Sequence, residues 1–309
     1  MADKMATRQA YGKTLIKLGE EYPNLVVMDA DLSKSTMTAE FGKTYPERFF
    51  NMGIAEQNLY GAAAGLALSG KVVCASTFAM FASGRAFEII RNSIGYTKAN
   101  VKICATHAGI TVGEDGASHQ TFEDIALMRT IPGMTVINPS DGVSAEKLLR
   151  QAVAMNGPCY VRLGRAAVPV FYDEKADITL GKANTVRDGN DVTVIATGIM
   201  VSEAVIAAEA LAEEGVDVRV IDMHTIKPID EEIIIKAAAE TGAIVTAEEH
   251  SVIGGLGSAV SEVVVKHNPV KMAMVGQQDT YGESGKPEEL KAKYGMTAED
   301  ILKAVRGVL

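Results

Sequence analysis

Residues 71–107, KVVCASTFAMFASGRAFEIIRNSIGYTKANVKICATH, begin and end with short apolar runs, KVVCAST and VKICATH, with a helical pattern between them. Runs that are hydrophobic on both faces and are separated by helices are typical of parallel strands in an α/β sheet. The same alternation continues in NLVVMDAD, MTVINPSD and CYVRLGR, and then in DVTVIATG, DVRVIDMH, AIVTAEEH and VKMAMVG. The sequence therefore predicts an α/β fold with mainly parallel sheets flanked by helices.

The length of the chain and one interruption in this alternation indicate two domains. The chain has 309 residues, which is enough for two domains of ordinary size. Between residues 168 and 190 it becomes a polar stretch with proline and glycine, VPVFYDEKADITLGKANTVRDGN, after which a new strand begins. We expect a first domain over residues 1–170, a linker over 171–190 and a second domain over 191–309.

The charge balance argues against two classes of partner. With 30 basic and 39 acidic side chains, the net charge of −9 gives no reason to bind a nucleic acid or an anionic membrane. The sequence shows neither a signal peptide nor an apolar run long enough to span a membrane. Cys74, Cys104 and Cys159 lie in apolar strand-like runs without metal-type spacing, as buried thiols do in a reducing compartment. We therefore expect a cytoplasmic protein in which any anionic ligand meets a local cluster of Arg and His.

Polar, aromatic and glycine-rich residues follow the predicted strands of the first domain. In parallel α/β sheets ligands bind at the carboxyl ends of the strands, so these positions form the candidate site. They are Asp29–Ser35, Ser76–Phe81, Thr106–Ser118 and Gly164–Arg165.

One acidic residue stands beside these segments, in NMGIAEQNLYGAAAGLALSG (residues 51–70). Glu56 begins a helix rich in Ala and Gly, where the helix dipole alone favours an acid. The alternative is a buried carboxyl that shares a proton with a ligand nitrogen. Phe78 and Phe81 leave a similar choice, because their spacing fits a helix core as well as a platform for a ligand.

A series of motifs, in order along nearly the whole chain, closely resembles the second and third domains of transketolases. The motifs are GIAEQN, STFAMF, THAGITVGEDGASHQTFEDIALMRTIPGMTVINPSD, IDMHTIKPID, EEHSVIGGLGSAVSEVV and SGKPEELKAKYGM. The resemblance implies a pyrimidine-binding thiamine-diphosphate fold followed by a transketolase C-terminal domain. It also implies a transferase that moves a two-carbon ketol unit from a ketose phosphate to an aldose phosphate in the pentose phosphate pathway.

The resemblance assigns the acidic and aromatic positions to the cofactor. In transketolases the glutamate matched by Glu56 hydrogen-bonds N1′ of the aminopyrimidine of thiamine diphosphate and promotes loss of the thiazolium C2 proton, a catalytic role. Phe78 and Phe81 match the aromatic wall of that ring, and Gly84 stands where the family often has a tyrosine. Asp31 matches an acid that reaches toward the cofactor and the dimer interface, although an aspartate after a strand is also an ordinary turn residue.

Six further positions match the substrate channel of the family. His107 and His119 match histidines that bind the sugar and move protons, and Asp115 matches an aspartate that binds a sugar hydroxyl. The distal phosphate of the sugar would be held by residues that match Arg8, Ser35 and Arg165. Arg162 is an alternative to Arg165, because both lie at the same strand end.

The second domain carries no catalytic group in this family. We interpret His224 and His267 as structural and His250 as an interdomain or interface residue. The glycine run VIGGLG, which contains Gly254, Gly255 and Gly257, could begin an anion-binding helix, although close packing at the domain interface explains it as well.

A part of the cofactor site has no counterpart in this chain. Transketolases bind the diphosphate and a divalent metal through a Gly-Asp-Gly motif in their first domain, and this sequence has no such motif. We therefore expect no metal site here and a separate N-terminal subunit that holds Mg²⁺ or a similar ion and shares thiamine diphosphate, as an α2β2 heterotetramer. The chain would then be the C-terminal subunit of a split transketolase.

Three alternatives stay open at this point. Two are enzymes: the β subunit of a 2-oxoacid dehydrogenase and a synthase of the deoxyxylulose-phosphate type. The third is a noncatalytic assembly subunit. The sequence does not identify the sugar, for which a pentose phosphate and sedoheptulose phosphate are the default.

Overall fold

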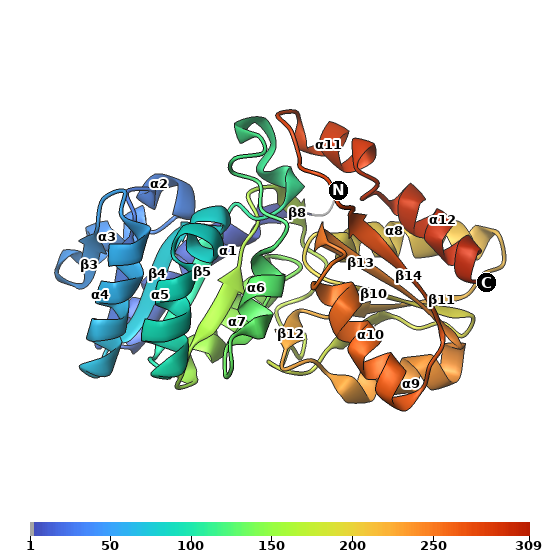
Figure 1. Cartoon of the computed structure of the whole chain (residues 1–309), viewed down its shortest axis with the longest axis horizontal. Helices are drawn as coiled ribbons and strands as arrows, with labels where there is room; N and C mark the ends of the chain where they lie inside the picture. Colours follow the sequence, from blue (N-terminus) through green and yellow to red (C-terminus); the bar gives the residue numbers. More distant parts are fainter. Residues whose placement is uncertain (1–2) are drawn as a thin grey trace.

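The computed structural model describes residues 3–309, which form two lobes, each built around one sheet (Figure 1). The first sheet runs in the order β12 (Thr225–Lys227), β6 (Thr135–Ile137), β7 (Cys159–Arg162), β5 (Val101–Thr106), β4 (Val72–Phe78), β2 (Leu25–Asp29), β3 (Phe49–Asn51). The second runs in the order β14 (Lys271–Gln277), β13 (Ala243–Ser251), β10 (Val192–Ala196), β11 (Val218–Asp222), β9 (Asn184–Arg187). The antiparallel pair β1 (Lys4–Ala6) and β8 (Ala167–Pro169) completes the strands. Every predicted apolar run forms a strand, and the α/β fold is confirmed.

Parallel pairing dominates both sheets. β2, β4, β5, β7 and β6 are parallel neighbours in the first sheet, as are β11, β10, β13 and β14 in the second. Only β12 and β9 join these sheets in the antiparallel sense, among the strands of residues 3–309. The strand interiors are buried throughout in β2, β4, β5 and β10, as sheets covered on both faces require.

Helices cover both faces of each sheet. In the first lobe they are α1 (Thr7–Glu21), α2 (Ser33–Thr36), α3 (Ala39–Thr44), η1 (Pro46–Arg48), α4 (Glu56–Leu68), η2 (Phe81–Arg85), α5 (Phe87–Ile89), η3 (Ile90–Tyr96), η4 (Ile110–Asp115), α6 (Asp124–Thr130) and α7 (Gly142–Ala154). In the second they are α8 (Met200–Glu213), α9 (Glu231–Thr241), α10 (Leu256–His267), α11 (Pro287–Lys293) and α12 (Ala298–Val308). No helix in residues 3–309 combines the length and the apolar composition that crossing a membrane requires.

Alternate residues of each central strand fill two separate cores. Val27 and Cys74 pack with α1 and α7 on one face of the first sheet, whereas Met28 and Ala75 pack with α4 and η3 on the other. All three cysteines are buried and unpaired, as expected. These two helical layers fix the strands, and with them the ends of the strands that carry the candidate site.

The two lobes share one strand and a buried polar interface. β12 lies beyond the predicted linker, yet it pairs antiparallel with β6 of the first sheet, Thr225 opposite Ile137. The buried Arg162 of β7 donates to both carboxylate oxygens of Asp124, at 2.8 and 3.2 Å, and to the carbonyl oxygen of Glu249 in the second lobe at 2.9 Å. The division of the chain at residues 171–190 remains a prediction.

The glycine run of the second lobe packs at this interface. A Cβ on Gly254 would lie 2.8 Å from the Cβ of Ala126, and Arg129 donates to the Gly254 carbonyl oxygen at 2.6 Å. The start of α10 already holds a carboxylate, because Glu248 accepts from the backbone N–H groups of Leu256 and Gly257. Close packing at the domain interface therefore explains Gly254, close packing within the second lobe explains Gly255 and Gly257, and the anion that the helix binds is the chain's own Glu248.

The histidines of the second lobe take structural positions. His250 is buried and receives the backbone N–H of Ala126 at 3.4 Å, which confirms its interdomain place. His224 is buried between Thr225 and Asn184, and burial lowers its pKa to about 4. His267 lies 3.8 Å from Glu231 at the end of α10.

A buried carboxyl lies where the two lobes meet the linker. Asp222, the last residue of β11, accepts from Ser140 Oγ at 2.6 Å and from the Tyr172 hydroxyl at 3.1 Å. Its other oxygen is buried and has no hydrogen-bond partner among residues 3–309. Burial raises the pKa of Asp222 to about 7, against the effect of these two hydrogen bonds.

Asp222→Asn should remove a pH dependence of stability. An unfolded aspartate titrates near pH 3.9, roughly, so the native carboxyl holds a proton that the unfolded one has lost. The contribution of Asp222 is therefore full below about pH 4 and decreases as the pH rises toward about 7, by at most about 1.4 kcal/mol per pH unit. Urea unfolding from pH 4.5 to 8 should show the variant gaining on the parent up to about pH 7 and no further. If the free energies of unfolding of variant and parent differed by the same amount at every pH, the raised pKa of Asp222 would be contradicted. Asp279→Asn, on an exposed loop, is the control.

Candidate active site

The carboxyl ends of the central strands carry the candidate site. Glu56 is the first residue of α4, and its side chain is only 2% exposed. Its carboxylate pairs with Nη1 of Arg85 at 3.1 Å, and the guanidinium carbon of Arg85 lies 4.6 Å from the centre of the Phe81 ring. Arg85 therefore places Glu56 and Phe81 in one site.

Phe78 and Phe81 form an aromatic cluster with the two predicted histidines. Phe78 ends β4 and Phe81 begins η2, so the interpretation of this pair as the core of a single helix is wrong. The two phenylalanine rings stack with centroids 6.1 Å apart, and the His107 ring stacks on Phe78 at 3.9 Å. The His119 ring lies edge-on to both, at 6.2 Å from Phe78 and 5.3 Å from Phe81. Four residues from three segments thus share one cluster.

His107 is held as a neutral imidazole with a defined tautomer. Its Nε2 lies 3.4 Å from Nη1 of Arg8, and its Nδ1 lies 2.8 Å from the Thr106 hydroxyl. Because a guanidinium can only donate, Nε2 accepts and the ring proton resides on Nδ1. Burial, followed by the charges of Arg8 and Arg165, lowers the pKa of His107 to about 3. Its φ of +58° is rare for a residue with a side chain, and such strain is concentrated at functional sites.

His119 and Asp115 lie on the loop that follows β5. The Nδ1 of His119 bonds the Ser118 hydroxyl at 2.9 Å, and within residues 3–309 no hydrogen bond to its Nε2 is formed. Asp115 ends η4, where its carboxylate lies 3.5 Å from Nη1 of Arg165. The loop thus places a half-buried imidazole against the aromatic cluster and an exposed carboxylate beside Arg165.

Two arginines give an acidic protein a local positive charge here. Arg8 donates through Nη1 to the Ser35 carbonyl oxygen at 2.7 Å, while its buried Nε has no partner among the described residues. Arg165 donates to the Val112 carbonyl oxygen and faces Glu114 and Asp115 at 3.5 Å. Burial lowers the pKa of Arg8, and repulsion by the Arg165 charge lowers it further. An anion between them would relieve that repulsion.

The structure also places three other residues that the sequence analysis named. Arg162 is buried in its pair with Asp124, so the alternative to Arg165 as a phosphate-binding residue is wrong. Asp31 lies two residues after β2 and exchanges hydrogen bonds with Asn51, and among the described residues it forms no hydrogen bond with the aromatic cluster. A Cβ on Gly84 would lie 2.6 Å from Cε of Met80, so a methionine methyl group occupies the space beside this glycine.

Arg85 is the site residue that sequence reasoning missed. It lies 29 residues from Glu56, and no periodicity connects a residue at a helix start with one in another segment. Phe81 and Arg85 are the first and last residues of η2, and this turn brings the Arg85 guanidinium over the Phe81 ring. A buried carboxylate that has no basic residue nearby in the sequence needs a cationic partner from a distant segment. This requirement was the one sign in the sequence that pointed to a residue such as Arg85.

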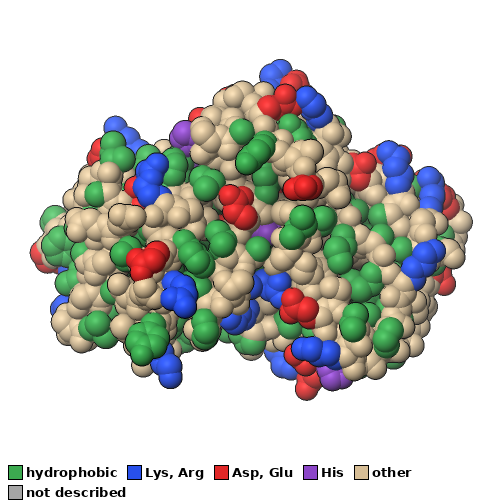
Figure 2. Space-filling model, in the orientation of Figure 1, with side chains coloured by type: hydrophobic (Ala, Val, Ile, Leu, Met, Phe, Trp, Pro, Cys, Tyr) green, Lys and Arg blue, Asp and Glu red, His purple; other side chains and the backbone are tan. Residues whose placement is uncertain are grey.

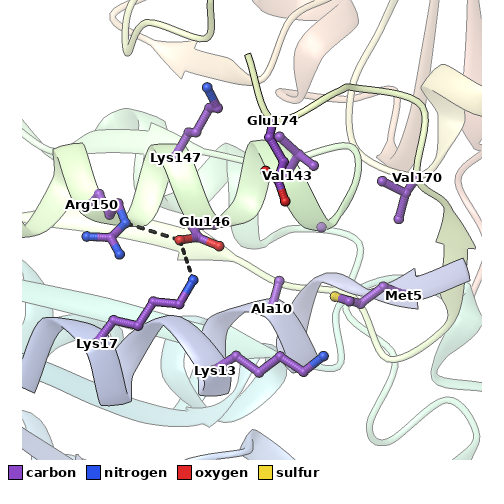
Figure 3. A pocket seen from close by; sticks show the side chains of 11 residues that line it. Met5, Ala10, Lys13, Lys17, Val143, Glu146, Lys147, Arg150, Val170 and Glu174 are labelled. Atoms are coloured by element: carbon purple, nitrogen blue, oxygen red, sulfur yellow. Dashed lines mark hydrogen bonds and ion pairs between the residues drawn. The ribbon is translucent and has the colours of Figure 1, made fainter. Parts of the chain in front are cut away.

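A groove between α1 and α7 contains none of these residues (Figure 3). Its charges mostly satisfy one another, because Glu146 bonds both Lys17 and Arg150 and Arg150 also bonds Glu21. Across the surface shown in Figure 2, acidic and basic side chains are interspersed. Residues 3–309 contain no group of three or more His, Cys, Asp or Glu side chains placed to hold a metal ion.

Two family models together match nearly the full chain. The family model described as the transketolase pyrimidine-binding domain matches residues 3–170, and that of the transketolase C-terminal domain matches residues 181–301. The chain belongs to the transketolase family. As expected of this transketolase fold, each matched domain contains one mainly parallel sheet.

Relatives of this transketolase chain include both half-length and full-length proteins. It is 54% identical to a putative transketolase C-terminal section of Methanocaldococcus jannaschii, over 96% of this chain and 94% of that one. It is 42% identical to a 6-deoxy-6-sulfo-D-fructose transketolase subunit of Clostridium sp., over 97% and 94%. It is 39% identical to human transketolase, of which it spans 50%.

A solved structure shares the whole transketolase fold of this chain. The structure described as a split gene transketolase, inactive beta4 tetramer, superimposes with a TM-score of 0.93 at 54% identity, over 99% of this chain and 98% of that one. The chain is therefore a split transketolase-like subunit of a transketolase-type enzyme, and its pyrimidine-binding domain implies thiamine diphosphate as the cofactor.

Proposed function

We propose that this chain is the C-terminal subunit of a two-chain transketolase that transfers a ketol unit between sugar phosphates. The observation that supports the proposal most is the continuity of the site. Contacts lead from Glu56 through Arg85 to Phe81, then through Phe78 and His107 to the guanidinium of Arg8. One end suits an aminopyrimidine and the other end suits a phosphate.

The residues present fit the aminopyrimidine half of thiamine diphosphate. Glu56 offers a buried carboxylate on the first turn of a helix, beside the half-buried face of Phe81. When bound, the cofactor supplies the carbanion chemistry that no side chain can supply. Glu56 would bind the ring nitrogen and exchange a proton there, whereas Phe78 and Phe81 would fix the plane of the ring by stacking. In the chain as it stands, Arg85 pairs with Oε2 of Glu56, so the ring nitrogen would bind Oε1 or take the place of Arg85.

The opposite end of the site would bind the substrate. Neutral His107 would accept a hydrogen bond from a sugar hydroxyl through Nε2, and His119, with Nε2 available, would move a proton during the reaction. Asp115 would select a hydroxyl by accepting its proton in a hydrogen bond. Arg8, Ser35 and Arg165 would hold the distal phosphate, since guanidinium groups bind phosphate through paired donors. Asp31 would reach toward the cofactor from the end of β2.

A partner chain completes the proposal. The chain is to be joined by an N-terminal subunit that holds the diphosphate and Mg²⁺, in an α2β2 complex in the cytoplasm. Support comes from the 54%-identical structure, which its description calls an inactive β4 tetramer, and from relatives named as C-terminal sections or subunits. The sugar remains open, because relatives are named for a sulfosugar and for apulose 4-phosphate, and the default here is the pentose phosphate pathway.

The test is capture followed by assay. Tagged chain is used to isolate its partner from native lysate, and ketol transfer between xylulose 5-phosphate and ribose 5-phosphate is measured with thiamine diphosphate and magnesium. The chain alone is measured in parallel. Activity confined to the captured complex supports the proposal, activity of the chain alone contradicts the need for a partner, and a complex inactive on pentose, sulfosugar and apulose phosphates contradicts ketol transfer.

Arg165→Met should weaken binding of the sugar phosphate in the captured complex. A hydrogen bond to a charged group contributes about 1.5 to 3 kcal/mol, which corresponds to a roughly 10- to 150-fold higher KM for the phosphorylated substrate. The KM for a nonphosphorylated acceptor such as glycolaldehyde should stay within about twofold. Arg91→Met, at an exposed residue that bonds only its neighbour Asn92, is the matched control. An equal rise for both acceptors would contradict a phosphate role.

A further inference from the structure

The loop that carries the predicted substrate residues is held by the second lobe. We propose that Glu249 and the turn of residues 282–287 position this loop, so that the C-terminal domain determines substrate affinity although it contributes no group to the site. The inference rests on the proposed function. It concerns the loop from His107 to Gln120, which Figure 1 shows beside α11.

Glu249 makes the central contact. Its buried carboxylate accepts the backbone N–H of Thr111 at 2.7 Å, across the interface between the lobes. A Cβ on Gly109 would lie 2.3 Å from the Glu249 carboxyl carbon, so only glycine permits this approach. Gly109 also has a φ of +79°, which side chains rarely adopt. The carboxylate therefore fixes the first turn of the loop, two residues after His107.

Glu249 is itself held in place. Its backbone carbonyl oxygen accepts from Nη2 of the buried Arg162 at 2.9 Å, and Arg162 is locked by Asp124. Burial raises the pKa of Glu249, while the Arg162 charge and the Thr111 N–H act in the opposite direction. A charged group that is fixed from both sides can hold a loop in one conformation.

The turn of residues 282–287 fixes the far end of the loop. Gln120 donates through Nε2 to the Glu283 carbonyl oxygen at 2.9 Å, one residue after His119. A Cβ on Gly282 would lie 2.0 Å from Oε1 of Gln120, and one on Gly116 would lie 2.5 Å from the Ser284 hydroxyl. Both ends of the loop thus contact the second lobe at backbone distance.

Between its two ends, the loop is also packed into the core of the second lobe. Ile110 is completely buried and belongs to the cluster that includes Leu290 of α11 and Val194 of β10. Pro287, the first residue of α11, would contact a Cβ on Gly113 at 3.2 Å. Asp115 and His119 project from a segment whose anchors lie on both sides of them. A shift of the second lobe would therefore move these side chains directly.

Glu249→Ala in the captured complex tests the inference. We expect the KM for the ketose phosphate to rise roughly tenfold or more, because the loss of a charge-assisted hydrogen bond from a displaced Asp115 or His119 weakens substrate binding by about that factor. The concentration of thiamine diphosphate that gives half-maximal activity should change less than about twofold, since Glu56, Phe78 and Phe81 lie on other segments. Glu249→Gln, which keeps an oxygen for the Thr111 N–H, should recover most of the affinity. Glu289→Ala on the exposed side of α11 is the matched control.

Two more measurements keep the test decisive. Gly282→Ala should give the same rise in KM without removal of a buried charge, because its methyl group displaces Gln120. In the isolated chain, hydrogen exchange of residues 109–120 should become faster in both variants, a readout that does not depend on activity.

Unchanged exchange would contradict the positioning role, and faster exchange with an unchanged KM would contradict its role in substrate affinity. A fall in kcat with unchanged KM would indicate general loss of structure and overturn the inference. If the parent complex fails to transfer ketol groups at all, the proposed function fails, whereas the exchange experiment still decides whether the second lobe holds the loop.

Discussion

Glu56→Gln should reduce ketol transfer by the captured complex about 10²- to 10⁴-fold, the range that a positioned acid–base group contributes. The amide has the size of the carboxyl but can neither take up a proton from the ring nitrogen nor pair ionically with Arg85. The loss should appear in kcat, measured at saturating thiamine diphosphate and substrate. KM for the sugar phosphate should change little, because Arg8 and Arg165 lie at the opposite end of the site.

The control must separate this loss from a failure of assembly. Glu47→Gln is matched in chemistry, since Glu47 is exposed and pairs only with the neighbouring Arg48. Both variants should capture the partner subunit to the same extent. Full activity of Glu56→Gln in such a complex would exclude the proton-exchange role and would favour a noncatalytic assembly function for this chain.

Asp124→Asn should lower the free energy of unfolding by about 3 to 5 kcal/mol, the usual effect of removing one partner of a buried ion pair. Arg162 would remain charged and buried with its Nε and Nη2 opposite a neutral amide. The Tyr160 hydroxyl, which donates to Asp124 at 2.7 Å, would also lose a charged acceptor. Urea unfolding at pH 7 and a fixed protein concentration measures the difference.

The stabilisation by the Asp124–Arg162 pair should change with pH in a defined direction. Burial alone would raise the pKa of Asp124, but the charges of Arg162 and His250 more than compensate, so its pKa lies below the ordinary value. The stabilisation is therefore complete above about pH 3.9 and is lost as the pH falls through the native pKa. Glu21→Gln, in an exposed pair with Arg150, should cost only about 0.2 to 1 kcal/mol. Equal losses in the two variants would show that burial adds nothing to the Asp124 pair.

The sequence predicts the sheets and the ends of the strands well because both depend on local pattern. In the run KVVCAST the residues from Val72 to Ala75 are hydrophobic without alternation, and β4 is buried at every position. The positions after β4 and β5 then follow from topology, and the structure brings Phe78, Phe81, His107 and His119 together there. The roles of these residues came from the resemblance and remain to be tested.

Contacts between distant segments could not be predicted in the same way. The Arg85 pair with Glu56 and the Glu249 contact to Thr111 each join segments whose separation carries no periodic signal. β12 was missed because three residues are too few for a recognisable pattern, and its pairing depends on where the second lobe packs. Short strands and interdomain hydrogen bonds are consequences of the assembled fold, not of local propensity.

The position of β12 limits how the two lobes of this chain can be separated or combined with lobes of other proteins. β6 would otherwise end the first sheet with a free edge, where unpaired N–H and C=O groups invite pairing with another molecule. The second lobe covers that edge with a strand of three residues, and Lys227 of this strand donates to the carbonyl oxygens of Arg129 and Ile131. Pro228 follows and cannot extend the ladder. A first lobe produced on its own would therefore expose an unpaired strand edge that is prone to aggregation. A chimera that takes its two lobes from different relatives would need a β12 whose sequence pairs with the β6 of the other relative.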